Sequence, residues 1–264
     1  MAVLFESHRI TVGAGALRVL TAGSGEPLVY LHGVGDAGEP FPALASLAER
    51  YRVVRPDHPG FIESDDLGAL SARDIAAVEL QLLDDLGIGS FVLIGCSFGG
   101  WVAAELALLA SDRVSRLLLI DAVGLAGPEP SLNIFEADPV TVLKATTYSD
   151  ERRALALAAP PAEPIATRLA RSRARAQLVA GDPYMHDPTL AARLSDLTVD
   201  TTVIWGAHDG VVPPSYARQW TRAISTAHLE IIDEAGHLPH IEQPERFLAV
   251  TGLLDAAAAT STGE

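Results

Sequence analysis

One segment constrains the fold of this 264-residue chain more than any other: Ile94-Gly95-Cys96-Ser97-Phe98-Gly99-Gly100-Trp101. It joins an apolar run at residues 91–94 to a stretch of helical character at residues 101–110. A serine between two glycines at such a junction predicts a sharp turn from strand to helix, because glycine leaves room where a Cβ would meet the neighbouring elements. The pentapeptide alone is weak evidence in a chain with 22 glycines. Its flanks favour a turn that exposes the Ser97 hydroxyl above a sheet over a turn that merely packs closely.

Apolar runs alternate with helical stretches over most of the chain. We expect strands at residues 9–12, 17–21, 27–32, 51–55, 90–94, 115–120, 202–205 and 229–232, and helices at 41–50, 71–86, 101–110, 216–224 and 245–254. The first two strands surround the Gly13-Ala14-Gly15 turn, which is typical of an antiparallel hairpin at a sheet edge. Several later strands are almost entirely apolar, as strands buried on both faces are. This alternation predicts an α/β fold with a doubly wound, mostly parallel sheet.

The alternation is interrupted between residues 124 and 196. This segment contains prolines and helical patches, and no run in it predicts a strand. Because it precedes the last two strand–helix units, we expect a helical cap over the carboxyl ends of the strands, where open α/β sheets bind ligands. The predicted organisation is a core formed by residues 1–123 and 197–255, a cap formed by residues 124–196, and a flexible tail at residues 256–264.

Two late loops contain groups that would activate a serine. A serine hydroxyl is a poor nucleophile unless a base accepts its proton, and the base needs a carboxylate that orients it. Asp209 follows the expected strand at 202–205, and His237 follows the one at 229–232. Ser97, Asp209 and His237 therefore occur in the chain order that hydrolases with a strand–turn–helix nucleophile use.

Other residues compete for these roles. Asp121 ends the strand before the expected cap and is the alternative acid. His208 lies on the loop of Asp209, from which it is badly placed to connect an acid with a nucleophile. His240 comes just before a helix, where a surface or supporting histidine is more common. The alternative role for Asp209 itself is to cap a turn.

With these three loops taken together, the chain resembles the α/β-hydrolase superfamily over residues 5–255. The resemblance is to the capped branch, which includes serine carboxylesterases, lactonases and meta-cleavage C–C hydrolases. It implies that Ser97 is the nucleophile, His237 the base and Asp209 the acid of a catalytic triad. It implies no metal and no organic cofactor.

The same resemblance implies an oxyanion hole and a substrate pocket. The backbone amides of Val34 and Phe98 would form the oxyanion hole, with Val34 inside the H-G-x-G segment at residues 32–35. We expect His32 to brace this loop rather than to titrate in catalysis. The residues expected to border the substrate are Gly33, His32, Trp101 and Leu238.

Two differences from members of this superfamily bear on the pocket and on the possible activities. Many relatives carry D-x-P-G-x-G-x-S after the fourth strand, whereas residues 57–64 have Ile62 in place of the second glycine. Since this loop borders the pocket, the pocket is expected to differ in shape. Epoxide hydrolases and haloalkane dehalogenases need aspartate as the nucleophile, so Ser97 excludes both activities.

The leading hypothesis is a serine-dependent hydrolase of small-molecule esters or lactones that acts by acyl transfer. The alternative is a C–C bond hydrolase acting on meta-cleavage ring-fission products. Residues 187–194 resemble the corresponding segment of such hydrolases. However, these enzymes often carry Trp at the position of Leu238. A small-molecule receptor that retains the triad is the second alternative. The intact set of three residues favours an enzyme, because a pure binder does not need it.

Composition excludes some partners. A formal charge of −15 argues against nucleic acid, which binds basic faces. Cys96 is the single cysteine, so an internal disulfide is excluded, and we expect it to face the interior. Glu6, His8 and Arg9 come too early for a signal peptide, and no long apolar span follows. We therefore expect a cytoplasmic protein without membrane contact that binds a small-molecule substrate, and the sequence is compatible with a homodimer.

Arginines gather in the expected cap despite the acidic composition. Three of them, Arg168, Arg171 and Arg175, are spaced to share one helix face. One interpretation is a solvated helix face. The other is that one arginine receives a substrate carboxylate, for which a guanidinium is well suited. The seven arginines of this segment are Arg152, Arg153, Arg168, Arg171, Arg173, Arg175 and Arg193.

Overall fold

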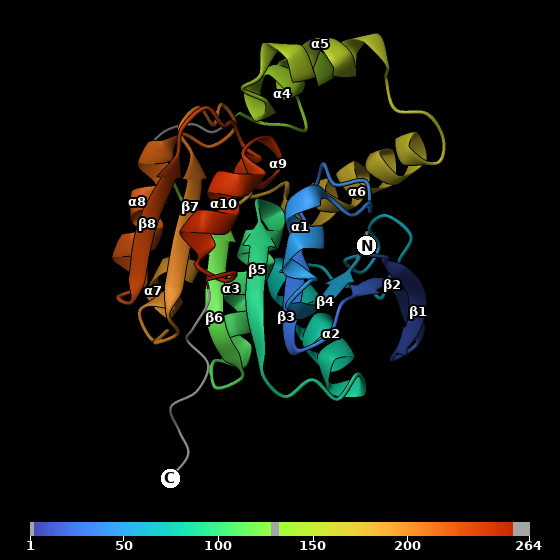
Figure 1. Cartoon of the computed structure of the whole chain (residues 1–264), viewed down its shortest axis with the longest axis vertical. Helices are drawn as coiled ribbons and strands as arrows, with labels where there is room; N and C mark the ends of the chain where they lie inside the picture. Colours follow the sequence, from blue (N-terminus) through green and yellow to red (C-terminus); the bar gives the residue numbers. More distant parts are fainter. Residues whose placement is uncertain (1–2, 128–131, 256–264) are drawn as a thin grey trace.

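The computed structural model describes residues 3–127 and 132–255, and the expected tail at 256–264 lies outside them. Its centre is an eight-stranded sheet in the order β1-β2-β4-β3-β5-β6-β7-β8 (Figure 1). The pairs β1–β2 and β2–β4 are antiparallel, and all the others are parallel. The predicted doubly wound, mostly parallel sheet with an edge hairpin is confirmed. The strands are β1 (Glu6–Val12), β2 (Gly15–Ala22), β3 (Glu26–Leu31), β4 (Tyr51–Pro56), β5 (Phe91–Cys96), β6 (Val114–Ile120), β7 (Thr201–Gly206) and β8 (Ala227–Ile232).

Helices cover both faces of the sheet. Successive residues of a buried strand point to opposite faces, so Val29 and Leu31 join one hydrophobic core while Leu28 and Tyr30 join the other. The first core includes α2, α3, α7 and α8, and the second includes α1 and α10. The helices are α1 (Pro42–Leu47), α2 (Ala72–Asp85), α3 (Phe98–Leu109), α4 (Pro139–Thr146), α5 (Asp150–Ala158), α6 (Ile165–Ala180), α7 (Leu190–Leu194), α8 (Pro214–Ala223), α9 (Pro239–Glu242) and α10 (Pro244–Thr251).

Local sequence signals explain where several elements begin and end. Ser71 precedes α2, and its hydroxyl accepts a hydrogen bond from the amide of Asp74, as an N-cap does. Gly87 follows α2 with φ of 67°, a left-handed conformation that favours glycine. The helix therefore occupies nearly the whole range predicted for it.

Helices α4 to α7 lie between β6 and β7, where the sequence predicts the cap. Figure 1 shows α4 and α5 beyond the ends of the central strands, and neither helix has a buried residue. By contrast, Leu190 and Leu194 of α7 are fully buried in the core shared with α8. The division of the chain into core and cap stays a prediction. None of the described helices is long and apolar enough to cross a membrane.

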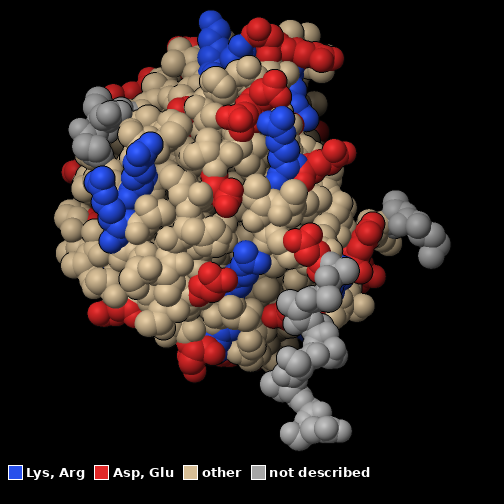
Figure 2. Space-filling view, turned by 60° about the vertical axis from the view of Figure 1, so that its left-hand side comes forward, with Lys and Arg blue, Asp and Glu red and all other residues tan. Residues whose placement is uncertain are grey.

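Charged groups of both signs are mixed over the surface. On the face drawn in Figure 2, Lys and Arg side chains lie singly or in small groups among acidic and uncharged residues. Acidic residues outnumber basic ones by 34 to 19 in the whole chain. A face of this kind lacks the continuous positive surface on which nucleic acids bind.

Candidate active site

Ser97 occupies the turn between β5 and α3 in a conformation that few residues adopt. Its φ is 54° and its ψ is −119°. Gly99 makes the close packing of this turn possible, because a Cβ there would lie 2.3 Å from the carbonyl oxygen of Leu31. A Cβ at Gly95 would likewise lie 2.3 Å from the carbonyl oxygen of Gly99. The glycines let the strand, the turn and the helix approach closely enough to hold Ser97 in its strained conformation.

Ser97, His237 and Asp209 are connected by two hydrogen bonds. The Oδ2 atom of Asp209 lies 2.7 Å from Nδ1 of His237, and the Oγ atom of Ser97 lies 2.8 Å from Nε2. Because a carboxylate only accepts, the imidazole proton is on Nδ1, and Nε2 is free to accept the serine proton. The structure therefore brings together the three residues that the sequence singles out, and their catalytic roles stay a prediction.

Backbone contacts hold Asp209 and His237 in place. The Oδ1 atom of Asp209 accepts hydrogen bonds from the amides of Val211 and Val212 at 2.8 and 3.0 Å. The amide of His237 donates to the carbonyl oxygen of Thr146 at the end of α4. Asp209 and His237 are both 5% exposed, so neither side chain is free to turn into solvent.

The two amides expected to form an oxyanion hole have no acceptor in the described part of the chain. Neither Val34 nor Phe98 donates a backbone hydrogen bond there. A Cβ built on Gly33 would lie 3.2 Å from Cβ of Ser97, so the loop before Val34 lies directly beside the serine. Phe98 is the first residue of α3, whose amino end carries a partial positive charge. These amides are suited to receive a negatively charged oxygen next to Ser97.

His32 is buried and uses both ring nitrogens within the protein. Its Nδ1 lies 2.9 Å from the carbonyl oxygen of Gly33, and its Nε2 accepts a hydrogen bond from the amide of His58 at 3.0 Å. Burial lowers the pKa of His32 well below its usual range, and the neighbouring His58 lowers it further. A neutral His32 therefore holds the loop in shape and has no nitrogen left for a substrate.

The chain matches the model of the "Alpha/beta hydrolase family" over residues 28–250. This chain belongs to the α/β hydrolase family. It is 30% identical over 243 residues to the pimeloyl-(acyl-carrier protein) methyl ester esterase of Photobacterium profundum, covering 86% of this chain and 94% of the relative. It is also 30% identical over 245 residues to the 2-hydroxymuconate semialdehyde hydrolase of Pseudomonas putida, covering 85% of each. Among solved structures, a bacterial membrane phospholipase A shares the fold with a TM-score of 0.78 at 22% identity, over 96% of this chain and 87% of that one.

The residues that compete for these roles make other contacts. His208 stacks on Tyr148, with ring centroids 4.4 Å apart. His240 is buried rather than at the surface, and its Nε2 lies 3.1 Å from the hydroxyl of Tyr30. Asp121 is fully buried, and its Oδ1 accepts a hydrogen bond from the amide of Gly206 at 3.0 Å.

Among the described residues, Asp121, Asp209 and His237 form a group whose possible metal-ligating atoms lie within 4.8 Å of one another. Nδ1 of His237 and Oδ2 of Asp209 face each other at 2.7 Å. This hydrogen bond occupies the atoms that an ion between the two side chains would need.

The remaining expected site residues surround the serine turn. Cys96 is 1% exposed, and burial raises the pKa of its thiol well above the usual range, so it faces the interior as an un-ionised thiol. Trp101 packs against Gly124, where a Cβ would lie 2.7 Å from the indole ring. Leu238 is half-buried next to His237. Roles for Gly33, Trp101 and Leu238 in substrate binding stay predictions.

Ile62 stands where the loop motif at residues 57–64 has its second glycine, and it keeps a backbone conformation typical of glycine. Its φ of 47° is left-handed, which is unusual for a β-branched residue and natural for the glycine of the relatives. The side chain is 2% exposed, and the amide donates to Oγ of Ser172 on α6 at 3.2 Å. Isoleucine therefore keeps the glycine-like backbone and fills the space beneath α6.

The loops before α1 and α2 bind Arg168, Arg171 and Arg175 of α6. Arg168 forms ion pairs of 2.6 Å with Glu39 and Glu63. Arg171 donates to the carbonyl oxygens of Ile62 and Ser64, at 3.1 and 2.6 Å. Neither a solvated face nor a carboxylate receptor describes this arrangement, because the guanidinium groups are already bound to the loop that precedes α2.

Glu242 is a further residue of the site, which no sequence pattern indicates, and it joins the segment between α4 and α5 to the loop of His237. Its carboxylate accepts hydrogen bonds from the amides of Tyr148, Ser149 and Gly236, at 2.7 to 3.0 Å. No pattern in the sequence indicates these contacts, because the partners Tyr148 and Glu242 are 94 positions apart.

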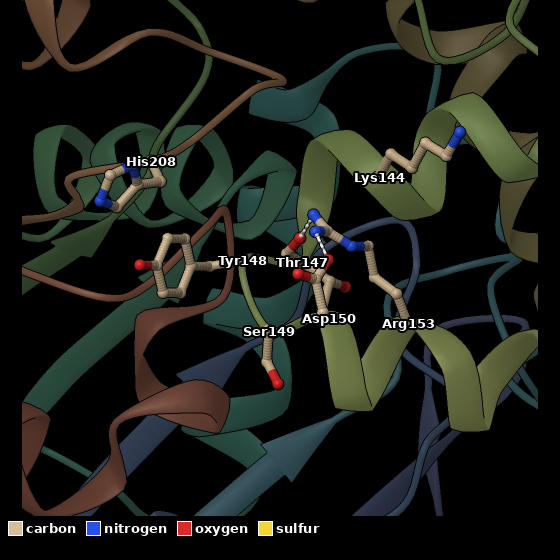
Figure 3. Close-up of a pocket in the computed structure, with 7 residues that line it drawn as sticks. All are labelled: Lys144, Thr147, Tyr148, Ser149, Asp150, Arg153 and His208. Atoms are coloured by element: carbon tan, nitrogen blue, oxygen red, sulfur yellow. Dashed lines mark hydrogen bonds and ion pairs between the residues drawn. The ribbon is translucent and has the colours of Figure 1, made fainter.

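A hollow of about 420 Å³ lies between the start of α5 and the loop of Asp209 (Figure 3). Ser97 does not line it, so this hollow is separate from the serine turn. Lys144 on α4 and Arg153 on α5 are among its lining residues, and Arg153 is bound to Asp150 and to the carbonyl oxygen of Thr147.

Proposed function

We propose that the chain is a serine-dependent hydrolase that cleaves small-molecule esters or lactones by acyl transfer, with Ser97 as nucleophile, His237 as base and Asp209 as acid. The proposal depends above all on the two consecutive hydrogen bonds, 2.8 Å from Ser97 to His237 and 2.7 Å from His237 to Asp209. Family membership supports it, and one relative at 30% identity is an esterase.

In the proposed reaction, Oγ of Ser97 attacks the carbonyl carbon while Nε2 of His237 accepts the serine proton. The Asp209 carboxylate stabilises the imidazolium that results and keeps its orientation. His237 then donates the proton to the leaving oxygen, which belongs to an alcohol in an ester or to the ring in a lactone. Water repeats the sequence on the acyl-enzyme and restores Ser97.

The amides of Val34 and Phe98 are the proposed donors to the negatively charged oxygen of the tetrahedral intermediate. Their lack of an acceptor in the described part of the chain supports this role. Such donors act strongly because they are fixed in place before the charge develops, and removing one typically costs about 10²- to 10³-fold in kcat. We propose that residues 124–196 act as the cap that covers the substrate.

A C–C bond hydrolase is the second candidate, favoured by the similarity to 2-hydroxymuconate semialdehyde hydrolase. The same triad would serve it. However, a ring-cleavage dienoate carries a carboxylate that calls for a cationic receptor. Arg168, Arg171 and Arg175 are already bound to the core. This favours neutral esters or lactones as substrates.

The test compares p-nitrophenyl esters of increasing acyl length, lactones and a ring-cleavage dienoate under the same conditions. We expect the highest kcat/KM with an ester or a lactone. Ser97→Ala should lower it by at least ~10³-fold while the circular dichroism spectrum stays that of the folded protein. A fluorophosphonate should label Ser97. Labelling at Cys96, or full activity of the alanine variant, would contradict the mechanism, and saturable binding without turnover would indicate a receptor.

A further inference from the structure

Two carboxyl groups meet behind the catalytic histidine. Asp121 follows β6 and Asp209 follows β7, so their carboxyl groups lie at the same edge of the sheet. Both belong to the group whose atoms lie within 4.8 Å of one another, together with His237. Asp121 is fully buried and Asp209 is 5% exposed. Two buried negative charges this close would repel strongly, so we expect one of the two carboxyl groups to hold a proton.

The contacts of the two groups decide which one holds the proton. Asp209 accepts three hydrogen bonds, from His237, Val211 and Val212. Asp121 accepts one, from the amide of Gly206 to its Oδ1. Its Oδ2 is buried and accepts no hydrogen bond from a described residue. Since hydrogen bonds from donors stabilise the ionised form, the charge belongs on Asp209 and the proton on Oδ2 of Asp121.

We infer that Asp121 is a neutral carboxylic acid that donates a hydrogen bond to the Asp209 carboxylate, and thereby acts as a positioning residue for the acid of the triad. Burial raises the pKa of Asp121 well above its usual range, and the charge of Asp209 raises it further. The conformation agrees with a fixed role: Asp121 has φ of 44°, and its amide donates to the carbonyl oxygen of Ile204.

The proton on Asp121 would affect how readily His237 accepts a proton. A donor on Asp209 draws negative charge away from His237 and limits how strongly the carboxylate favours the imidazolium. The other ionisable groups that affect Asp121 or share its surroundings are Cys96, whose thiol is un-ionised, and Glu242, whose carboxylate is bound to backbone amides. The inference rests on the proposed function only in naming Asp209 as the catalytic acid.

The test measures the titration midpoint of the His237 imidazole by NMR, which requires no substrate. Asp121→Asn keeps the geometry, because the amide oxygen can accept from Gly206 while the amide nitrogen donates to Asp209. It also suits the left-handed backbone. Asp121→Ala removes the donor. Asp112→Asn, an exposed change at the opposite end of β6, is the matched control.

We expect the midpoint in Asp121→Asn to stay within about 0.3 pH units of the wild type, and in Asp121→Ala to rise by roughly half a unit to one unit. An ionised Asp121 would instead lower the midpoint in Asp121→Asn by about one unit or more, because a nearby negative charge is lost. That result would overturn the inference.

A second measurement does not depend on how well the alanine variant folds. The infrared spectrum of the wild type at neutral pH should contain the C=O band of a protonated carboxyl, and this band should be missing in Asp121→Asn. A wild-type spectrum without the band would overturn the inference. Neither measurement uses turnover. Absence of esterase activity would therefore contradict the proposed function, while the NMR and infrared results would still show whether Asp121 is protonated.

Discussion

Arg175 on α6 forms an ion pair of 3.0 Å with Asp66 in the loop before α2. Its guanidinium also donates to the carbonyl oxygen of Ala69, and the residue is only 7% exposed. With Arg168 and Arg171, it attaches α6 to the same loop through side chains from one helix face. Helix α6 is therefore held on this loop by arginine contacts as well as by apolar packing.

We expect Arg175→Gln to lower the free energy of unfolding by about 1–3 kcal/mol, because a buried carbonyl and a carboxylate lose their donor. Asp66 is half exposed, and solvent screening therefore limits what the ion pair contributes to the free energy of unfolding. Urea unfolding measures the change. Since the guanidinium is bound to the core, any loss of kcat/KM should be equal for a neutral ester and for its carboxylate-bearing analogue.

Arg152→Gln is the matched control for this arginine. Arg152 is exposed on α5, and its side chain has no hydrogen bond or ion pair within the described residues. The Arg152→Gln variant should unfold at the same urea concentration as the wild type. A loss confined to the anionic substrate in Arg175→Gln would restore the carboxylate-receptor interpretation.

The central part of the site could be predicted because it depends on local chain geometry. Ser97 follows an apolar strand between glycines, while Asp209 and His237 each follow a strand of the same parallel sheet. Since the carboxyl ends of parallel strands lie at one edge, the three loops had to meet there. The expected start of the helix after Ser97 was three residues late, because Gly99 and Gly100 weaken helix propensity while tight packing on β3 favours the helix.

The contacts between the cap segment and the core could not be predicted in this way. Glu242 binds the amide of Tyr148 across 94 positions, and Arg168 binds Glu63 across 105. Helix and strand periodicity relates residues only a few positions apart, so no sequence pattern predicts contacts over such separations. These contacts depend on how α4 to α6 fold back on the core, so the α6 arginines could be placed on one face but not assigned a partner.

Asp209→Asn should lower kcat/KM by about 10²- to 10⁴-fold, because an amide can present a donor to Nδ1 of His237 and favour the wrong tautomer. Steady-state kinetics with a p-nitrophenyl ester measures the loss. Asp121→Asn is the comparison and should retain most of the activity, since the amide can keep the hydrogen bond from Gly206 and can make the one inferred to Asp209. A larger loss in Asp121→Asn than in Asp209→Asn would place the catalytic acid after β6.

Gly99→Ala should disrupt the serine turn. The new Cβ would lie 2.3 Å from the carbonyl oxygen of Leu31 and 2.5 Å from that of His32, and backbone atoms cannot move aside cheaply. We expect a loss of about 2 kcal/mol or more in the free energy of unfolding, together with a loss of ester turnover. Gly89→Ala is the control, because no atom lies within 4 Å of its Cβ. Wild-type stability and activity in Gly99→Ala would contradict the close packing of this turn.

His240 gives the hydrolase a built-in sensitivity to acid. It lies 2% exposed among Tyr30, Phe41 and Phe247, and burial lowers its pKa to about 3. In the unfolded chain the same imidazole titrates near 6.5. Between these two values the unfolded chain binds a proton that the folded chain does not. The stability that His240 contributes is therefore complete above about pH 6.5 and is lost as the pH falls toward 3.

We expect His240→Gln to remove this part of the pH dependence. Between about pH 6.5 and pH 4.5 the wild type should lose about 2 kcal/mol more of its free energy of unfolding than the variant, as measured by urea unfolding at each pH. Tyr30→Phe is the matched control, because it removes the 3.1 Å contact with Nε2 but keeps the titrating ring. It should be less stable at every pH with the wild-type slope. An unchanged slope in His240→Gln would mean that the folded protein does not hold this histidine neutral.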